Sequence, residues 1–182
     1  MKLVNSYTVR PLEEKDLQMI LSWRNDCRIH SIMLTDHEIT WNEHVNWFNN
    51  IKDATPKRNL VFMYNNKPVG YIGYTEYDSV NQSCSPGAYL APDELLPLDA
   101  GMVLFYYSCA YAFDVLKMKR LNTDVFAKNK KAVKIDKFLG YQISQDEEHS
   151  VIKNGEEEKV FRMVLTKEQW SLRKKYLDEI IE

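Results

Sequence analysis

The sequence predicts an α/β (α+β) fold with a central mixed, mostly antiparallel β-sheet flanked by helices. Hydrophobic periods of 2 and of 3.6 residues follow one another along the chain in the order β-α-α-β-β-β-α-β-α-β-β-α. A meander of strands followed by a buried helix and a parallel return strand places that helix on one face of a mixed sheet. No linker, repeat or low-complexity segment interrupts this order, so we expect a single domain over residues 1–182.

The composition is that of an ordinary folded protein. Charged residues make up 27% of the chain and hydrophobic residues 45%, close to the average for globular proteins. The formal net charge of -2 argues against nucleic acid as a partner, because phosphate contacts need clustered Lys and Arg. The basic run at residues 128–137 favours a solvated helix face, with a phosphate-bearing small ligand as the alternative.

The cysteines and the N-terminal segment bear on the compartment. Cys27, Cys84 and Cys109 lie far apart and form no CxxC pair, so neither a zinc site nor a disulfide framework is expected. The first residues are too polar for a signal peptide, and no apolar run approaches the roughly 18 residues of a membrane span. We therefore expect a cytoplasmic protein with no membrane partner.

The N-terminal third predicts one strand followed by two helices. Residues 7–12 alternate in polarity and include a Pro. Residues 13–26 carry apolar side chains at helical spacing, with acidic residues in the first turn that complement the helix dipole. A second helix is expected to begin near Thr40, because Glu43 three residues later completes a capping box.

The middle of the chain predicts the meander and the buried helix. Strands are expected at residues 59–65, 65–78 and 85–91, the first two joined by the turn sequence NNKP. Residues 101–118 are the most apolar stretch, and their length and their few β-branched residues favour a helix. Residues 121–127 then predict the return strand.

The C-terminal part predicts a helix, a closing hairpin and a last helix. The helix at residues 129–140 ends at Gly140 in a C-cap position. Strands at 141–145 and 158–166 are expected to form a hairpin around the turn residues Asn154 and Gly155. The final helix, residues 166–182, begins with a capping box.

Gly101 stands where the chain enters the buried helix. Unpaired amide N–H groups at a helix start form an anion site, and a glycine there lets a pyrophosphate approach closely. A plain loop glycine is the alternative interpretation.

The element order and two motifs resemble the GNAT superfamily of acetyl-CoA-dependent N-acetyltransferases, over nearly the whole chain. The family's coenzyme loop, Arg or Gln followed by x-x-Gly-x-Gly or Ala, falls on residues 98–103. Gly101 matches this pattern, whereas Leu98 and Val103 depart from it. The fold that the resemblance implies is the GNAT fold, in which neighbouring strands splay apart to admit the pantetheine arm.

The second motif is VFAKNKKAVKIDKFLGYQ, which resembles the family's V-x-x-x-N-x-x-A-x-x-x-Tyr-x-x-x-Gly-Phe segment. Asn129, Ala132, Gly140 and Tyr141 fall in register, and Asp136 stands at the position of the family's Tyr. The resemblance implies acetyl-CoA as cosubstrate, no metal, and an oxyanion donor on a strand amide near residues 89–91. The expected coenzyme contacts are Tyr89, Leu90, Ala91, Leu98, Asp99, Ala100, Gly101, Met102, Val103, Asn129, Lys131, Ala132 and Asp136.

Residues 20–48 narrow the resemblance to a branch, because their "WRN … H … WF" pattern is similar to the opening of PseH-like acetyltransferases. That branch implies a small-molecule acceptor, the 4-amino group of a UDP-linked deoxy sugar used for nonulosonic acid synthesis. Ribosomal-protein N-terminal acetyltransferases share a similar opening, and an inactive GNAT-fold coenzyme-binding module is a further alternative. The expected acceptor contacts are Arg24, Asn25, Trp41 and His44, with core packing as the alternative for the last two.

Acetyl transfer to an amine needs a group that takes a proton from nitrogen. Asp124 is preferred, because a carboxylate inside an otherwise apolar strand is uncommon. A structural hydrogen bond or ion pair is the equal alternative for Asp124, and Glu76 is a further candidate.

The departing thiolate needs a proton as well. Lys134 and Lys137 are close to Asp136 in sequence, so we expect an ionised, non-catalytic Asp136. Water or a tyrosine such as Tyr141 or Tyr89 would then protonate the thiolate. The closing hairpin and the last helix also offer apolar surface for a homodimer.

Overall fold

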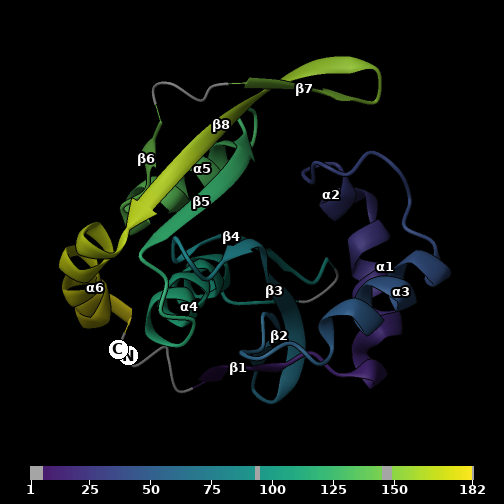
Figure 1. Cartoon of the computed structure of the whole chain (residues 1–182), viewed down its shortest axis with the longest axis horizontal. Coiled ribbons are helices and arrows are strands. Elements are labelled where there is room, and N and C mark those ends of the chain that lie inside the picture. The colour runs from purple at the N-terminus through teal and green to yellow at the C-terminus, as the bar shows by residue number, and fades with distance from the viewer. Residues whose placement is uncertain (1–5, 93–94, 145–148, 182) are drawn as a thin grey trace.

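The computed structural model describes residues 6–92, 95–144 and 149–181 and has the predicted mixed α/β architecture (Figure 1). One eight-stranded sheet runs in the order β1-β2-β3-β4-β5-β8-β6, and β7 also pairs with β8. The strands are β1 (Tyr7–Pro11), β2 (Asn59–Tyr64), β3 (Lys67–Asp78), β4 (Ser83–Leu90), β5 (Arg120–Phe126), β6 (Gln142–Ile143), β7 (His149–Lys153) and β8 (Glu156–Thr166). The helices are the 3-10 turn η2 (Glu14–Asp16), α1 (Leu17–Asn25), α2 (Cys27–His30), α3 (Trp41–Ile51), α4 (Ala100–Asp114), α5 (Lys130–Leu139) and α6 (Lys167–Ile181).

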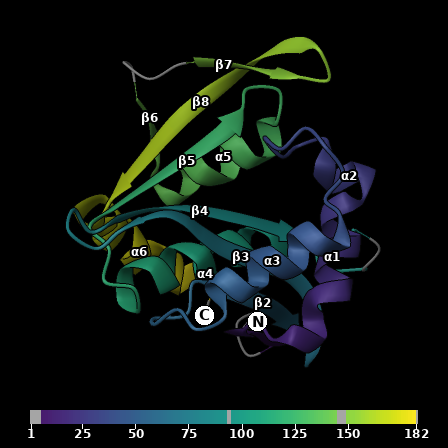
Figure 2. The ribbon, with the colours of Figure 1, turned by 45° about the vertical axis from the view of Figure 1, so that its right-hand side comes forward.

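The sheet splays between β4 and β5. These strands are parallel, and their register is confined to Ser83↔Arg120 and Cys84↔Leu121. Figure 2 shows them meeting at one end and diverging toward the other. The splay divides an antiparallel half, β1 to β4, from a second antiparallel half built by β5, β8, β6 and β7.

Two hydrophobic cores cover opposite faces of the sheet. The larger one holds α4, α5 and α6 against strand residues such as Leu121, Val125 and Met163. The smaller one packs α1 and α3 against β2 through Ile20, Phe48 and Val61. Because side chains alternate along a strand, each strand residue can be assigned to one of these two faces.

Several helix ends follow from sequence. The side chain of Thr40 accepts a hydrogen bond from the Glu43 amide, and the Glu43 side chain accepts one from the Thr40 amide, so the predicted capping box is present. Gly140 ends α5 with φ 106°, a left-handed conformation that glycine adopts without steric cost. Gln169 and Thr166 exchange the equivalent bonds at the start of α6.

Two features depart from the predicted order. The helix at residues 13–26 is followed by a separate short helix, because Asp26 turns the chain and its side chain caps α2 through the Arg28 amide. The Asn154–Gly155 turn joins β8 to β7 rather than to the strand predicted at 141–145. That strand is the two-residue β6, which pairs with β8 farther along, and Gln145 lies outside the described residues. Within the described part of the chain, no helix combines the length and the apolar character that a membrane crossing requires.

Candidate active site

At the open end of the splay β4 and β5 no longer pair, and both strands carry polar side chains on the same face of the sheet. Ala88 and Leu90 pack against the larger core, so Tyr89 points to the opposite face, where its ring lies 5.3 Å from that of Tyr71. Leu121 and Val125 belong to the larger core, so Asp124 lies on the same face as Tyr89. The two diverging strands therefore carry polar side chains on one face, beside the gap between β4 and β5 that we call the opening.

The first wall of this opening contains Arg24, in the last turn of α1. Burial lowers the pKa of its guanidinium. The phenols of Tyr89 and Tyr71 act on the same pKa in the opposite direction. Its Nη1 atom is buried and has no hydrogen-bond partner in the described structure. A desolvated cation without a counter-charge is costly, so this position favours an anionic ligand.

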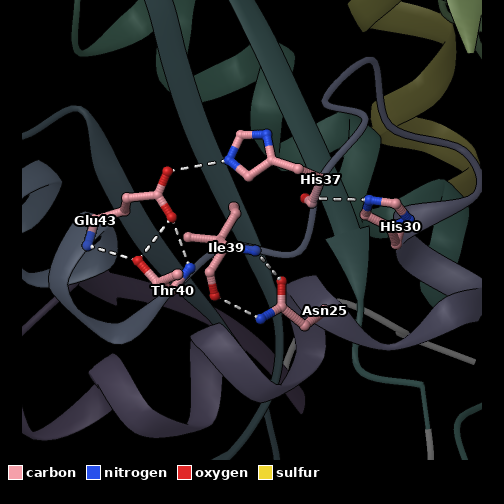
Figure 3. A network of polar contacts seen from close by, with 6 residues as sticks. All are labelled: Asn25, His30, His37, Ile39, Thr40 and Glu43. Carbon is pink, nitrogen blue, oxygen red and sulfur yellow. Dashed lines mark hydrogen bonds and ion pairs between the residues drawn. The ribbon is translucent and has the colours of Figure 1, made fainter.

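The other predicted acceptor residues have different surroundings. Asn25 holds the loop before α3, donating to the Ile39 carbonyl at 2.8 Å and accepting from the Ile39 amide at 3.0 Å (Figure 3). His44 is buried, its ring stacks on Trp47, and burial lowers its pKa. Trp41 begins α3 and is 51% exposed. The geometry therefore gives Asn25 and His44 structural contacts.

The second wall contains Asp124 on β5, Arg162 on β8 and His149 on β7. Asp124 and Arg162 are directly opposite in the strand register. Arg162 donates from Nε and Nη2 to the two carboxylate oxygens at 2.5 and 2.9 Å. His149 Nε2 lies 3.8 Å from Asp124 Oδ2. Asp124 is thus ion-paired, which is the structural alternative left open for it, and it stands beside a histidine.

A hydrogen bond joins two chain segments that are 118 residues apart, the β7–β8 hairpin and the loop before α3. The ammonium of Lys153, at the tip of the β7–β8 hairpin, is buried and donates to the Thr35 carbonyl at 2.5 Å. The Asn154 amide donates to the carboxylate of Asp36. Figure 1 shows the hairpin reaching out from the sheet on the side of α2.

The loop that receives the hairpin is fixed by side chains of its own. His30 Nε2 lies 3.2 Å from the His37 carbonyl oxygen, and His37 Nε2 lies 3.1 Å from Glu43 Oε1; Figure 3 shows both contacts. Glu43 also accepts from the Thr40 amide at 2.8 Å. The loop between α2 and α3 is therefore a tethered segment.

The strand amides near residues 89–91 are not equivalent. The Ala91 amide donates to the Val69 carbonyl at 2.8 Å and is occupied by the pairing of β3 with β4. Amides alternate in direction along a strand, so that of Leu90 points to the other edge, into the splay. Of the expected oxyanion donors, the geometry favours Leu90 over Ala91.

The start of α4 offers two amides to an anion. The amides of Ala100 and Val103 donate to the carbonyls of Pro97 and Asp99, whereas no backbone acceptor among the described residues bonds those of Gly101 and Met102. A Cβ added at Gly101 would have Ile135 Cδ1 as its nearest neighbour, at 3.9 Å, so packing does not require the glycine.

Side chains contribute little to this helix start. Leu98 is fully exposed, and the Asp99 carboxylate has a buried Oδ2 with no hydrogen-bond partner among the described residues. Asn129 caps α5 through the Ala132 amide at 3.2 Å, and Lys131 is exposed on the first turn. The structure thus assigns Asn129 a capping role and leaves Lys131 accessible to a phosphate.

The expectation that Lys134 and Lys137 keep the pKa of Asp136 low and its carboxyl ionised is wrong. Asp136 is 2% exposed, and burial raises the pKa of its carboxyl to about 7. Lys134 and Lys137 are exposed, because they leave the helix in other directions, while Asp136 shares the buried face of Val133 and Leu139.

Asp136 belongs to a buried polar cluster between α4 and α5. Its Oδ2 has no hydrogen-bond partner in the described structure, and its charge acts on Cys109 and Tyr141. Cys109 Sγ donates to the Tyr141 hydroxyl at 3.7 Å, and burial raises the pKa of Tyr141 well above its ordinary value. A carboxyl with a raised pKa can keep a proton near neutral pH, and a proton donor in a dry site requires this property.

Glu76 lies away from the open end of the splay. It is exposed, sits at the bulge between Thr75 and Asp78, and accepts from Ser85 Oγ at 2.5 Å. Tyr89 follows Ser85 by four positions, roughly 13 Å along an extended strand. The geometry therefore does not bring Glu76 to the residues that face the opening.

Tyr71, Arg162, His149 and Lys153 are site residues that the sequence reasoning missed. They come from β3, β8 and the β7–β8 hairpin, and only the strand register places them at the opening. Among the described residues, no group of three or more His, Cys, Asp or Glu side chains could hold a metal ion.

The sheet splayed between β4 and β5, the Leu90 amide directed away from β3 and the buried carboxyl between α4 and α5 are features expected of an acyltransferase. The sequence matches the family described as "Acetyltransferase (GNAT) domain" over residues 7–142. The chain belongs to this GNAT family and is an N-acetyltransferase, and acetyltransferases of this family use acetyl-CoA.

Named relatives agree with this assignment. Acetyltransferase PseH of Campylobacter jejuni serotype O:2 is 30% identical over 124 residues, which cover 68% of this chain and 75% of the relative. PseH of C. jejuni serotype O:23/36 is 26% identical over 148 residues, covering 80% and 90%. These matches support a PseH-like branch of the family.

Solved structures share the fold. Spermidine N-acetyltransferase from Vibrio cholerae in complex with CoA and spermine has a TM-score of 0.83 and 21% identity, and the alignment covers 92% of this chain and 99% of that one. A dodecameric structure of spermidine N-acetyltransferase from the same organism has a TM-score of 0.74 and 21% identity, covering 96% and 98%. At this identity the likeness concerns the fold.

Proposed function

We propose that this N-acetyltransferase transfers the acetyl group of acetyl-CoA to the amino group of a nucleotide-linked (UDP) 4-amino deoxy sugar. The observation that carries the proposal is the half-buried Arg24, whose Nη1 has no partner among the described residues. A diphosphate would supply the missing charge, and a guanidinium is suited to bind two of its oxygens. The PseH relatives and the "WRN" opening support the same substrate class.

The same observation distinguishes this acceptor from a polyamine. Spermidine is a cation, so carboxylates in a binding site raise the affinity for it and a buried cation lowers that affinity. On the first wall, the charged group beside Tyr71 and Tyr89 is the guanidinium of Arg24. Fold likeness to spermidine acetyltransferases therefore does not extend, in this proposal, to their acceptor.

The proposed chemistry is direct transfer. The amine nitrogen attacks the thioester carbonyl, and the Leu90 amide donates to the oxygen as it becomes negative. The carbon–sulfur bond breaks, and the carboxyl of Asp136 supplies the proton that the thiolate takes up. The amides of Gly101 and Met102 and the side chain of Lys131 bind the coenzyme's phosphates.

A panel of acceptors tests the proposal through the release of free CoA thiol. We expect turnover with a UDP-linked 4-amino deoxy sugar and little with spermidine or with a peptide bearing a free N-terminus. Turnover with the peptide alone would favour the ribosomal-protein or peptide alternative. Coenzyme binding by calorimetry without turnover of any acceptor would favour an inactive binding module.

The location and the assembly are further proposals. A cytoplasmic site is supported by the absence of disulfide partners for Cys27, Cys84 and Cys109, which are all free thiols. A homodimer is supported by exposed apolar side chains on α6 and on the β7–β8 hairpin, Leu172 and Ile152 among them. Light scattering on the purified protein measures its mass directly, and a monomeric mass would contradict the dimer.

A further inference from the structure

The two walls of the opening belong to different halves of the sheet. Arg24 of the first wall is on α1, which packs with α3 against β2. Asp124 and Arg162 of the second wall are on β5 and β8. The strands β4 and β5 pair at two residue positions, at the closed end of the splay. A contact between the halves at the other end would therefore determine how far apart the two walls stand.

The β7–β8 hairpin extends the second half beyond the open end of the splay. Val160 of β8 stands opposite Phe126, the last residue of β5. The hairpin then continues for four residues, from Val160 to the closing pair Lys153↔Glu156, which is roughly 13 Å farther along the strand. Both residues of its two-residue turn have positive φ angles, as such a tight turn requires. The tight turn limits the positions that Lys153 can take.

The loop between α2 and α3 lies at the open end of the first half. Arg28 of α2 donates to the carbonyl of Pro92, two residues after the end of β4, at 2.8 Å. Farther along the chain, Asn25 exchanges two hydrogen bonds with the backbone of Ile39, near the end of the loop. Asn25 follows Arg24 in the last turn of α1. The position of this loop is therefore coupled to the helix end that carries Arg24.

Lys153 connects the hairpin to this loop. Its ammonium donates to the Thr35 carbonyl at 2.5 Å and lies 3.5 Å from Asp36 Oδ1. The Asn154 amide donates to both oxygens of the same carboxylate, at 3.0 and 3.1 Å. A side chain and the backbone of the hairpin thus both bind the loop, and the contact joins the two halves of the sheet beyond the open ends of β4 and β5.

The burial of this ammonium indicates a positioning role. The side chain of Lys153 is 2% exposed, whereas that of Asp36 is 43% exposed, so water weakens the attraction that offsets the desolvation of the ammonium. Glu158, on the same face of the hairpin, pairs with Lys128. An apolar side chain can replace a buried charge without loss of stability in many proteins, but it makes no directional hydrogen bond. Lys153 therefore specifies the place at which the loop docks.

We propose that Lys153 is a positioning residue for the acceptor, because its contact with Thr35 fixes the separation of the two walls of the opening. The docked arrangement binds the acceptor, and release of the loop from the hairpin moves the helix end of Arg24 away from the second wall. The proposed coenzyme contacts, at the starts of α4 and α5, do not include the hairpin or the loop. This inference rests on the proposed function for the place of the acceptor beside Arg24.

The test measures the steady-state kinetics of Lys153→Met, with CoA release as the readout. The apparent affinity for the acceptor falls in proportion to the fraction of molecules in the docked arrangement. We expect the acceptor KM to rise about 10-fold or more, because a hydrogen bond from a charged group is lost. The KM for acetyl-CoA and kcat at saturating acceptor should stay unchanged. Lys153→Gln, which keeps N–H donors for the Thr35 carbonyl, should raise the acceptor KM less.

Two further variants separate positioning from other effects. Asp36→Ala removes the acceptor of the Asn154 amide and should raise the acceptor KM too. The double variant Lys153→Met/Asp36→Ala should raise it by less than the product of the two single effects, because each change already breaks the same contact. Lys159→Met is the matched control and should keep the wild-type constants, since Lys159 lies over Phe161 on the other face of the hairpin.

Hydrogen exchange tests the coupling between the contact and α1 without any acceptor. In Lys153→Met, faster amide exchange should extend from residues 31–40 to residues 22–25 in the last turn of α1, because Asn25 is bonded to the loop. Lys159→Met should leave both segments unchanged. Faster exchange that is confined to the hairpin and the loop would contradict the coupling to Arg24.

The outcomes distinguish this inference from the proposed function. If the wild type acetylates a different amine and not the sugar nucleotide, the acceptor proposal fails, and the KM of that amine is measured in the Lys153 variants. A wild-type acceptor KM in Lys153→Met would overturn the role of Lys153, whichever amine is used. A lower melting temperature with an unchanged acceptor KM would overturn it too, since that result assigns Lys153 to stability alone. The exchange measurement decides the coupling even if no amine is acetylated.

Discussion

Arg24 and Arg10 are two arginines of the N-terminal region in opposite electrostatic situations. Arg10 donates to both carboxylate oxygens of the buried Asp16 at 2.6 and 2.7 Å. Arg24 has a buried Nη1 without a partner in the described structure. A paired guanidinium stabilises the fold, whereas a buried unpaired guanidinium lowers the stability of the fold. An anionic ligand that pairs with it offsets this loss.

We expect Arg24→Met to raise KM for the sugar nucleotide about 10- to 100-fold, because a charge-assisted hydrogen bond contributes about 1.5–3 kcal/mol. KM for acetyl-CoA should stay unchanged, and the melting temperature should stay or rise, because a buried unpaired charge is removed. Steady-state kinetics and thermal unfolding measure these effects. Arg10→Met is the matched control and should do the reverse, losing about 3–5 kcal/mol of stability with an unchanged acceptor KM. A large loss of stability in Arg24→Met would contradict the assignment.

Asp136 makes stability depend on pH. Its pKa in the folded state is about 7, raised by burial from 3.8. Between these pH values the folded protein binds more protons than the unfolded chain, so the free energy of unfolding falls as pH rises through this window and levels off above it. The contribution is largest in acid and is lost at neutral pH.

We expect Asp136→Asn to remove this decline. The melting temperature of the variant should not change between pH 5 and 8, except through other groups that titrate in this range. At pH 8 the variant should be more stable than the wild type by up to about 4 kcal/mol. Thermal unfolding at several pH values measures it, and kcat should fall because the thiolate loses its proton donor. A wild-type slope in Asp136→Asn would mean that another group is responsible.

Sequence reasoning reached some of these residues and missed the surroundings that decide their roles. A sequence motif identifies Arg24. The lack of a partner for its Nη1 atom among the described residues depends on β3 and β4, which place Tyr71 and Tyr89 beside it. The spacing of the second motif identifies Asp136, but the lysines beside it in sequence are not its neighbours in space. Helical geometry turns Lys134 and Lys137 away from its buried face.

At the scale of elements, local chemistry was predictable and pairing was not. Capping boxes, the Gly140 C-cap and the Asn154–Gly155 turn are short-range patterns, and the structure has them all. The closing part of the sheet contains two short strands, because β7 pairs with the first half of β8 and β6 pairs with β8 farther along. No short-range pattern encodes that division, because it follows from contacts distant in sequence.

The contact between the hairpin and the loop before α3 yields a prediction at this scale. We expect Lys153→Met, which keeps the apolar stem and removes the bond to Thr35, to speed amide exchange in residues 31–40 and 149–158. Its cost should be about 1–3 kcal/mol, because the Thr35 carbonyl loses a charged partner. Hydrogen-exchange mass spectrometry localises the effect. Lys159→Met, which alters the same hairpin on its other face, should leave exchange in residues 31–40 unchanged.

For the whole molecule, coenzyme binding should appear as stabilisation of the folded state. Acetyl-CoA at 100 times its dissociation constant adds about 2.7 kcal/mol, which for a domain of this size raises the melting temperature by roughly 5–10 °C. We expect this shift in a thermal scan, despite Leu98 and Val103 at the coenzyme loop, because the proposed phosphate contacts are backbone amides, which do not depend on these side chains. The absence of a shift at millimolar acetyl-CoA would contradict the coenzyme site.

The strand order determines which part of the chain would build each wall of the acceptor site. β8 lies between β5 and β6, so the half of the sheet beyond the splay is completed by residues after 142, where the family match ends. The proposed coenzyme contacts precede that point, whereas Arg162, His149 and Lys153 follow it. Exchanging the C-terminal segment with that of a related acetyltransferase should therefore replace one wall of the acceptor site and leave the donor site native. This segment is then the natural unit to exchange when the aim is to change which amine is acetylated.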